Sequence, residues 1–283
     1  MPNVPLLERL RNPAPVVGVL RLDGIIGGLG TFRKGLTLSK LTDSIERAFK
    51  LRRLEAVALA INSPGGSAVQ SALIARRIRE LADENGIPVF AFAEDVAASG
   101  GYWLALAADE IYANESSIIG SIGVVSGGFG FSDLIKRLGI ERRLHTAGVK
   151  KAILDPFQPE KPSDVSHLKG ILSDIHESFE AMVRERRGKR LKGKEKELFS
   201  GAFWTGARAL ELGLIDGLGD MRGVLRGKFG ERVKLKEIRG RKSFWRRRMS
   251  LAGPLGRGGG GQDWAGSVIA AIEERLIWNW FGL

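Results

Sequence analysis

The chain alternates short, β-branched apolar runs with amphipathic segments, and this alternation restricts its fold more than any other feature. Apolar runs that end at turn residues are typical of buried strands, and apolar side chains at three-and-four spacing are typical of helices. The predicted strands cover residues 16–22, 56–61, 88–93 and 110–113. The predicted helices between them cover residues 39–51, 67–82 and 99–107. This order predicts an α/β fold with a mostly parallel sheet.

Beyond residue 120 the pattern is mainly helical. Apolar residues at three-and-four spacing predict one long helix over residues 163–187, with Ser163 as its N-cap. Shorter helices are expected at residues 133–138 and 205–212, and a strand at residues 141–146. We expect residues 1–15 to be an N-terminal segment and residues 16–236 to form one main domain.

The C-terminal part has a different composition. Residues 237–263 are rich in glycine and arginine, which predicts a flexible linker because such a segment is solvated rather than packed. Apolar residues recur every four positions within residues 264–283, which predicts an amphipathic helix with too many central charges to span a bilayer. We expect this tail to bind anionic lipid peripherally. A flexible tail, or a helix docked on its own domain, remains an alternative.

Charge and composition exclude several classes of function. The chain has 44 basic and 32 acidic residues, a net charge of +12, but residues 57–130 contain few lysines or arginines. The absence of cysteine excludes disulfides, thiolate zinc sites and a cysteine nucleophile. No phosphate loop, metal-ligand cluster or nucleic-acid reader motif occurs, so we expect no cofactor, metal or nucleic acid. The N-terminal residues lack a signal-peptide core, which favours a cytoplasmic protein, with peripheral contact at the inner face of the membrane.

One serine has the surroundings of a nucleophile. Ser99 lies in the stretch AASGGY, residues 97–102, directly after a predicted strand. Small neighbours let a substrate carbonyl approach, and the start of the following helix stabilises negative charge. The N–H of Gly100 would then be placed to bind an oxyanion. A serine at a helix start is more often only a cap.

A second glycine turn, NSPGG at residues 62–66, ends the neighbouring predicted strand. Its proline fixes the turn and its glycines allow the backbone to approach a ligand, which suits a second oxyanion donor. The ends of neighbouring parallel strands meet at one edge of a sheet, where such folds build their sites. A plain strand-ending turn is the alternative.

A nucleophilic serine needs a base, and histidine is a poor candidate here. Of the three histidines, His167 and His176 lie in the predicted long helix, where an exposed side chain is the usual explanation. No histidine lies within residues 99–144, and His145 comes only after that stretch. A lysine can replace histidine if burial lowers its pKa from about 10.4 toward about 7–8. Lys150 and Lys151, beside an apolar run, are the candidates, and residue chemistry does not separate them.

Together these motifs resemble the signal peptide peptidase A (protease IV) family of Ser-Lys peptidases, whose fold is similar to those of ClpP and crotonase. The resemblance covers roughly residues 16–219. The matching motifs are NSPGG at 62–66, AASGGY at 97–102, IGSIGV at 119–124, the segment around Lys151, and WTG at 204–206 leading to LGLID at 212–216. The resemblance implies a fold of repeated ββα and βα units.

The resemblance also implies a role for each site residue. Ser99 would be the nucleophile, Lys151 the general base, and the N–H groups of Gly66 and Gly100 the oxyanion hole, while Ser121 would orient the lysine amine. Lys151 is chosen over its neighbour because its separation from Ser99, 151 − 99 = 52, fits the family pattern. Family members tend to form homo-oligomeric rings in which the lysine comes from an adjacent protomer. The implied substrates are unfolded or hydrophobic peptides.

The sequence departs from the family in two places, and two other functions compete. Family members usually have an N-terminal membrane anchor and a polar residue after the lysine, whereas here Ala152 follows Lys151.

A crotonase-like acyl-CoA enzyme would need carboxylates as acid and base, for which only Glu94 and Asp95 are near the proposed site. A non-enzymatic, membrane-associated scaffold would instead act through residues 239–283.

Overall fold

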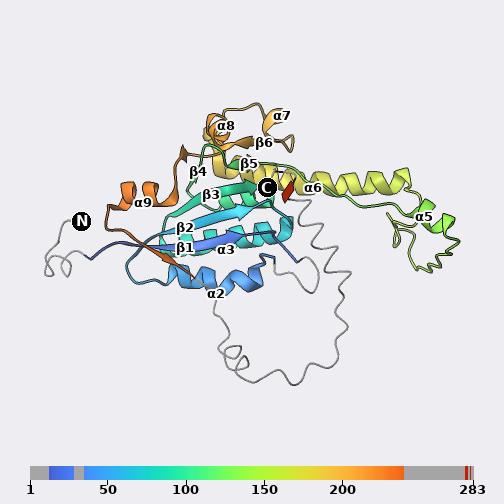
Figure 1. Cartoon of the computed structure of the whole chain (residues 1–283), viewed down its shortest axis with the longest axis horizontal. Helices are drawn as coiled ribbons and strands as arrows, with labels where there is room; N and C mark the ends of the chain where they lie inside the picture. Colours follow the sequence, from blue (N-terminus) through green and yellow to red (C-terminus); the bar gives the residue numbers. More distant parts are fainter. Residues whose placement is uncertain (1–12, 29–34, 239–277, 280, 282–283) are drawn as a thin grey trace, which may run out of the picture.

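A single mixed sheet with helices on both faces forms the body of the protein (Figure 1). The computed structural model describes residues 13–28, 35–238, 278, 279 and 281. The described strands are β1 (Val16–Asp23), β2 (Leu54–Ser63), β3 (Val89–Ala98), β4 (Glu110–Ala113), β5 (Ile118–Gly120), β6 (Phe203–Thr205), β7 (Gly217–Leu218) and β8 (Lys234–Glu237). The described helices are α2 (Leu38–Phe49), α3 (Ala68–Asn85), α4 (Gly100–Ala105), α5 (Ser132–Arg137), α6 (Pro162–Arg187), α7 (Glu195–Leu198), α8 (Gly206–Glu211) and α9 (Met221–Phe229), with a 3₁₀ turn at Gly188–Arg190.

The sheet is mostly parallel, as the sequence predicts. Its strands follow the order β6-β5-β3-β2-β1-β8, and β4 lies between β3 and β7. Every described pair is parallel except β5 with β6. The first half of β3 pairs with β4 and its second half with β5, so the end of β3 is enclosed by β2 and β5. The carboxyl ends of these parallel strands meet at one edge, where α/β folds place their sites.

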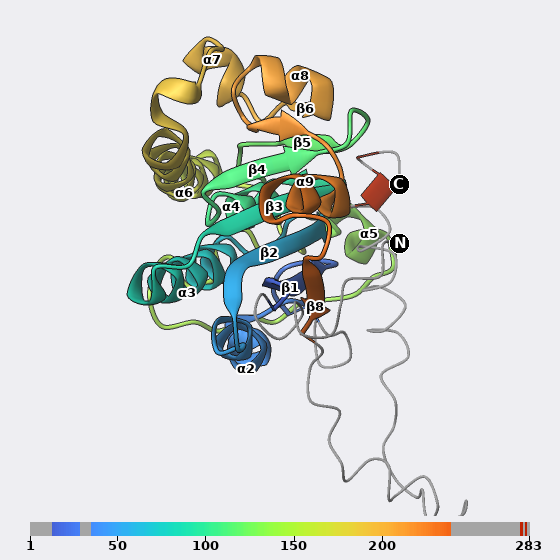
Figure 2. The same cartoon turned by 90° about the vertical axis from the view of Figure 1, so that its left-hand side faces the viewer.

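Alternating side chains of the central strands build two apolar cores. Leu20, Leu59 and Ala91 face a large core beneath α2, α3, α4 and α6. Val19 and Ala58 face a smaller core covered by α9. Figure 2 shows these two helical layers on opposite sides of the sheet. Strands that are buried on both faces appear in the sequence as nearly continuous apolar runs, which is why their positions were predictable.

A bulge in β3 adjusts the strand just before Ser99. The pairing of β2 with β3 shifts register between Ile61 and Ser63. The amide of Asn62 fills this irregularity, because its Nδ2 donates to Asp95 Oδ2 at 3.0 Å and its Oδ1 accepts from Val96 N at 3.3 Å. The side chain of Asn62, the first residue of the NSPGG turn, therefore holds the last part of β3 in place.

A lobe, residues 125–161, leaves the body after β5 and returns through α6. Figure 1 shows α5 beyond the end of α6, away from the sheet. Only the second half of α6 packs on the body, where Phe179 stacks on Trp103 of α4 with ring centroids 4.5 Å apart. Large apolar side chains are exposed along the lobe, namely Val125, Phe129, Phe131, Leu134, Leu138, Ile140, Leu144 and Val149. The lobe thus lacks a packing partner within the described chain.

Two local predictions were wrong. Residues 141–146 form no strand, because they lie in the exposed lobe, where no described strand is near enough to pair with them. The long helix begins at Pro162 after the cap residue Lys161, so Ser163 lies in the first turn rather than at the cap. Proline suits a first helical position because its fixed φ fits the helix and it has no N–H to satisfy there.

The predicted C-terminal helix lies outside the described residues, apart from three positions. Phe281 N–H donates to the carbonyl of Trp278 at 3.0 Å, and the Phe281 ring meets that of Phe203 on β6 at a centroid distance of 5.2 Å. Within the described part of the chain, no helix is both long enough and apolar enough to cross a bilayer. The same residues contain no cluster of side chains suited to a metal ion.

Candidate active site

Ser99 lies in a strained turn between β3 and α4. Its φ is +51°, a conformation that costs a residue other than glycine on the order of 1–3 kcal/mol. Two backbone hydrogen bonds hold it there: Ser99 N–H donates to the Gly120 carbonyl at 2.8 Å, and the Ser99 carbonyl accepts from Trp103 N–H at 3.0 Å. A strained serine between a strand and a helix is the backbone device that presents the nucleophile in α/β-hydrolases.

Glycines wall the space beside Ser99. A Cβ on Gly65 would lie 2.8 Å from both the Gly100 nitrogen and the Ser99 Cβ, and a Cβ on Gly100 would lie 2.4 Å from Ser71 Oγ. Gly65 and Gly66 also have φ angles of +106° and +138°, which other residues rarely adopt. The NSPGG turn and the start of α4 can therefore touch only because neither carries a side chain at the contact.

The backbone at this contact offers two free donors. Ile26 N–H donates to the Gly65 carbonyl and Ser67 N–H to the Ile26 carbonyl, each at 2.8 Å. This bridge leaves the N–H of Gly66 without an acceptor in the described part of the chain. Gly100 is the first residue of α4, and the first N–H groups of a helix have no acceptor within it. Two such donors beside a nucleophile are what an oxyanion requires.

Ser121 lies next to this notch. It follows β5 directly, has a φ of +52°, and donates its N–H to the Ala202 carbonyl at 2.7 Å. The preceding residue, Gly120, supplies the carbonyl that accepts from Ser99 N–H. The structure therefore brings four of the five predicted site residues to one edge of the sheet: Ser99, Gly66, Gly100 and Ser121.

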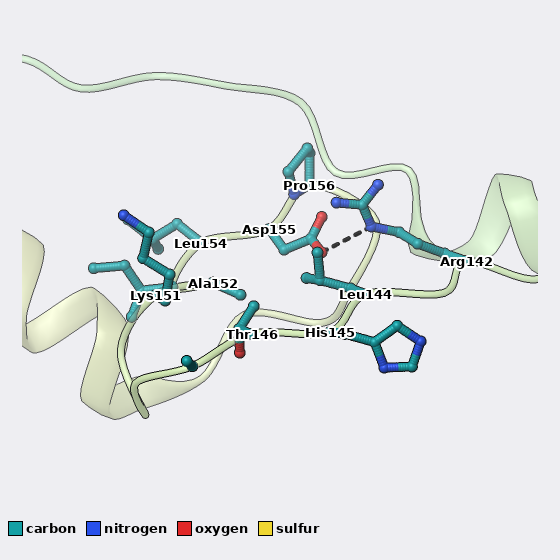
Figure 3. Close-up of a pocket in the computed structure, with 11 residues that line it drawn as sticks. Arg142, Leu144, His145, Thr146, Lys151, Ala152, Leu154, Asp155 and Pro156 are labelled. Atoms are coloured by element: carbon teal, nitrogen blue, oxygen red, sulfur yellow. Dashed lines mark hydrogen bonds and ion pairs between the residues drawn. The ribbon is translucent and has the colours of Figure 1, made fainter.

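Lys151 is not brought to Ser99 within the single chain. It lines a hollow of about 580 Å³ between two limbs of the lobe, residues 142–147 and 151–156, and Figure 3 shows its amine directed away from the other charged groups of that hollow. Lys150 and Lys151 are both exposed, and neither amine has a hydrogen bond or ion pair among the described residues. One chain alone thus holds a serine without its predicted base.

An ion pair stiffens the hollow around Lys151. Arg142 Nε donates to Asp155 Oδ2 at 2.9 Å, and the guanidinium lies 4.8 Å from the centre of the Phe157 ring. The N–H of Phe157 and the bond from Arg142 lower the pKa of Asp155 below its ordinary value. The carboxylate is therefore charged at neutral pH, and the two limbs of the lobe are held together on the side away from Lys151.

The carboxylates that a crotonase-like enzyme would need are engaged elsewhere. Glu94 Oε2 accepts from Arg21 Nη1 at 2.7 Å, and Asp95 accepts from the Asn62 amide. A carboxylate held in these bonds does not face the Ser99 notch as a free base. The geometry therefore gives no support to acyl-CoA chemistry.

A buried network behind α4 was not predicted from the sequence. The hydroxyl of Tyr102 donates to the Leu214 carbonyl at 2.7 Å, and Arg187 Nε donates to the Gly213 carbonyl at 2.9 Å. Arg187 Nη1 also pairs with Asp216 Oδ2 at 2.7 Å. Burial raises the pKa of the Tyr102 hydroxyl, which keeps it a neutral donor. These bonds anchor the helix that begins beside Ser99. The only sequence signal for them was the LGLID motif at residues 212–216, which contains the partners of Tyr102 and Arg187.

Comparisons with known proteins agree with this geometry. The sequence profile of peptidase family S49 matches residues 82–231, which include the Ser99 turn, β5, the lobe and the LGLID motif. The chain belongs to peptidase family S49. A putative protease of Synechocystis is 33% identical over 69% of this chain and 72% of its own length. The predicted family resemblance is thereby confirmed.

A second relative is longer than this chain. It is named as the Na⁺/H⁺ antiporter NhaA of Brucella abortus, and it is 48% identical over 98% of this chain but only 38% of its own length. The chain therefore spans little more than a third of that relative. Among solved structures, a membrane-bound stomatin-specific protease aligns over 81% of this chain and 99% of its own, with 17% identity and a TM-score of 0.49.

Proposed function

We propose that this chain is a serine endopeptidase that hydrolyses unfolded or hydrophobic peptides, with Ser99 as nucleophile and Lys151 of a second copy as general base. The observation that carries the proposal is the strained Ser99 inside a glycine-walled notch with two free N–H donors. The residues on this sheet edge supply everything that acyl transfer requires except a proton acceptor.

The chemistry follows from these parts. The Ser99 hydroxyl oxygen bonds to the substrate carbonyl carbon while its proton passes to the uncharged lysine amine. The carbonyl oxygen becomes an oxyanion that accepts hydrogen bonds from Gly66 N–H and Gly100 N–H. The lysine then protonates the departing amine as the peptide bond breaks. Water attacks the acyl-enzyme by the same route in reverse, with the lysine taking its proton and returning it to Ser99.

A second copy is the proposed source of the base for two reasons. Lys151 belongs to a lobe whose apolar side chains are exposed, including Val149, which is fully exposed, and Phe129 at 74%. The α3 helix, which starts directly after the NSPGG turn, also exposes Val69 and Leu73. Apolar surfaces of this kind mark interaction sites, and a lysine accepts a proton at neutral pH only after burial has removed its charge. A ring of identical copies would bury the lobe and bring the amine to a neighbouring serine.

The tail adds a proposal about location. Residues 237–263 are rich in arginine and glycine, and residues 264–283 carry apolar side chains at every fourth position from Trp264 to Trp280. We propose that this segment contacts the anionic inner face of the membrane from the cytoplasmic side. Co-sedimentation of the full chain with phosphatidylglycerol vesicles, compared with a chain ending at residue 238, tests it. Equal sedimentation of both chains would contradict it.

Variants of the two proposed catalytic residues test the peptidase function. Ser99→Ala and Lys151→Ala should each abolish hydrolysis of casein and reaction with a fluorophosphonate probe, while Lys150→Ala, the matched control, keeps both. Full activity of either of the first two variants would remove that residue from the mechanism.

Mixing the two inactive variants tests the second copy. If the base comes from a neighbour, rings that contain both Ser99→Ala and Lys151→Ala chains include pairs with an intact serine facing an intact lysine. Unfolding and refolding the two together should therefore restore part of the activity, while each alone stays inactive. If the mixture stays inactive although mixed rings form, the lysine acts within its own chain.

A further inference from the structure

His176 of α6 lies against the turn that follows β5. Its Nε2 is 3.1 Å from the carbonyl oxygen of Ile122 and 3.5 Å from Glu180 Oε1. Both neighbours are acceptors, so the proton belongs on Nε2 and the imidazole donates to the carbonyl. This contact was not predicted, because a single histidine on an amphipathic helix resembles an ordinary surface residue.

A ladder of side chains along α6 fixes the imidazole from behind. Glu180, four residues after His176, accepts at its other oxygen from Arg184 Nη2 at 2.8 Å. Arg184 in turn pairs through Nε with Glu195 of α7 at 3.1 Å. His176 and Glu180 are only 29% and 19% exposed. Residues four apart lie on the same face of a helix, so this ladder holds the ring in one orientation.

The turn that His176 contacts touches the nucleophile. Gly120 accepts from Ser99 N–H at 2.8 Å, and Gly123 N–H donates to the Ser121 carbonyl at 2.9 Å. Ile122 itself is fully buried. Within the described ranges, His176 is the only side chain that hydrogen-bonds to the backbone of residues 120–124. The same turn is where the chain leaves the body for the lobe, so one bond joins the outgoing limb to the returning helix.

We propose that His176 is a positioning residue of the peptidase site. Its bond to Ile122 holds the turn so that the Gly120 carbonyl and Ser121 keep Ser99 in its strained conformation. The bond also fixes the direction in which the lobe carries Lys151 away from the body. The catalytic part of this inference rests on the proposed function. The structural part, a turn held by an imidazole, does not.

Hydrogen exchange tests the structural part without reference to activity. In His176→Leu, peptides covering residues 118–124 should exchange several-fold faster than in the parent protein, because the clamp is lost. In His176→Gln, whose amide nitrogen can reach the same carbonyl, exchange should stay near that of the parent. The matched control is His167→Leu, which alters an exposed histidine of the same helix. Equal exchange in His176→Leu and His167→Leu would overturn the proposal.

Kinetics test the catalytic part. His176→Leu should lower kcat about ten-fold or more while KM changes less than two-fold, because displacement of catalytic groups by an ångström is costly and the substrate contacts remain. His176→Gln should recover most of the loss, with oligomer mass unchanged in all variants. If the kcat of His176→Gln is no higher than that of His176→Leu, the positioning role is overturned. If leucine unfolds the protein, His176→Asn, too short to reach the carbonyl, replaces it in the comparison with glutamine.

The two proposals fail in distinguishable ways. If the parent protein does not react with a fluorophosphonate at Ser99, the proposed function is wrong, yet the exchange experiment still decides whether His176 holds the turn. If the parent reacts and His176→Leu reacts at the same rate, the peptidase function stands and the positioning role is refuted.

Discussion

The body and the lobe hold their functional residues in opposite ways. Around Ser99 the backbone is fixed by strands, glycine contacts and buried hydrogen bonds, so the geometry exists before any substrate arrives. Around Lys151 the chain is exposed and the amine has no partner among the described residues. Under the proposed function, the acyl-transfer half of the site is built by folding, whereas the proton-transfer half requires a second copy.

The largest difference between the two regions should appear when glycines are replaced. A Cβ on Gly65 would lie 2.8 Å from the backbone nitrogen of Gly100, one of the proposed oxyanion donors, so Gly65→Ala should lower kcat about 100-fold to 1,000-fold. Gly127 in the lobe has no atom within 4 Å of such a Cβ, and Gly127→Ala should leave peptide hydrolysis unchanged. Steady-state assays of both variants make the comparison. Similar activity in the two would show that the notch is not the reaction site.

The second-largest difference should appear in how much an ion pair of the body and an ion pair of the lobe contribute to the free energy of unfolding. Arg187 pairs with Asp216 at a site where the arginine side chain is 2% exposed, and breaking a buried pair costs about 3–5 kcal/mol. Arg142, 38% exposed in the lobe, pairs with Asp155, and pairs of this kind contribute about 1 kcal/mol or less. Urea unfolding of Arg187→Met and Arg142→Met should reproduce this order. A reversed order would mean that the lobe, not the body, carries the stability.

Low pH should lower the free energy of unfolding of the body, by less than the loss of the buried ion pair does. Burial alone would raise the pKa of Asp216, but the bonds from Arg187 and from Ile111 N–H lower it below the ordinary 3.8. A carboxyl with a depressed folded pKa stabilises the fold above its unfolded pKa and loses that contribution as pH falls through the folded value. The unfolding free energy of the parent should therefore decline below about pH 4 more steeply than that of Asp216→Asn. Parallel curves would show that this carboxyl is not linked to folding.

The smallest effect on stability should come from the apolar surface of the lobe. Val149→Ser and Phe129→Ser change exposed side chains, so the free energy of unfolding should shift by no more than about 0.5 kcal/mol. The mass of the oligomer in light scattering should nevertheless fall, since these side chains form the proposed contact between copies. Unchanged mass in the double variant would place the contact elsewhere.

Sequence patterns predicted the parts of the molecule that local physics decides. The buried strands β1, β2 and β3 appear as continuous apolar runs, and the small residues around Ser99 mark the turn before α4. The approach of the NSPGG turn to Gly100 was predictable because turns at neighbouring strand ends meet at one edge, while the choice of Gly66 within that turn came from the family resemblance. These features depend on a few adjacent residues, so a window of sequence contains them.

Other features depend on contacts between distant segments and left no local sign. A strand was predicted at residues 141–146, but a strand needs a partner, and the lobe provides none in the described chain. The spacing between Ser99 and Lys151 fits the family, yet it does not say whether the chain folds back on itself or extends away. Arg187 and His176 were missed because each contacts a segment far away in the sequence, Gly213 and Asp216 for Arg187 and Ile122 for His176.

The length of α6 has a consequence for when such an enzyme can act. A helix of 26 residues extends about 39 Å, and its far end carries the lobe. Under the proposed function, a newly synthesised copy on the ribosome would keep Lys151 out of reach of its own Ser99 and so would cut nothing. Turnover per molecule should then rise steeply with concentration, and dilution alone would suffice to silence the protease.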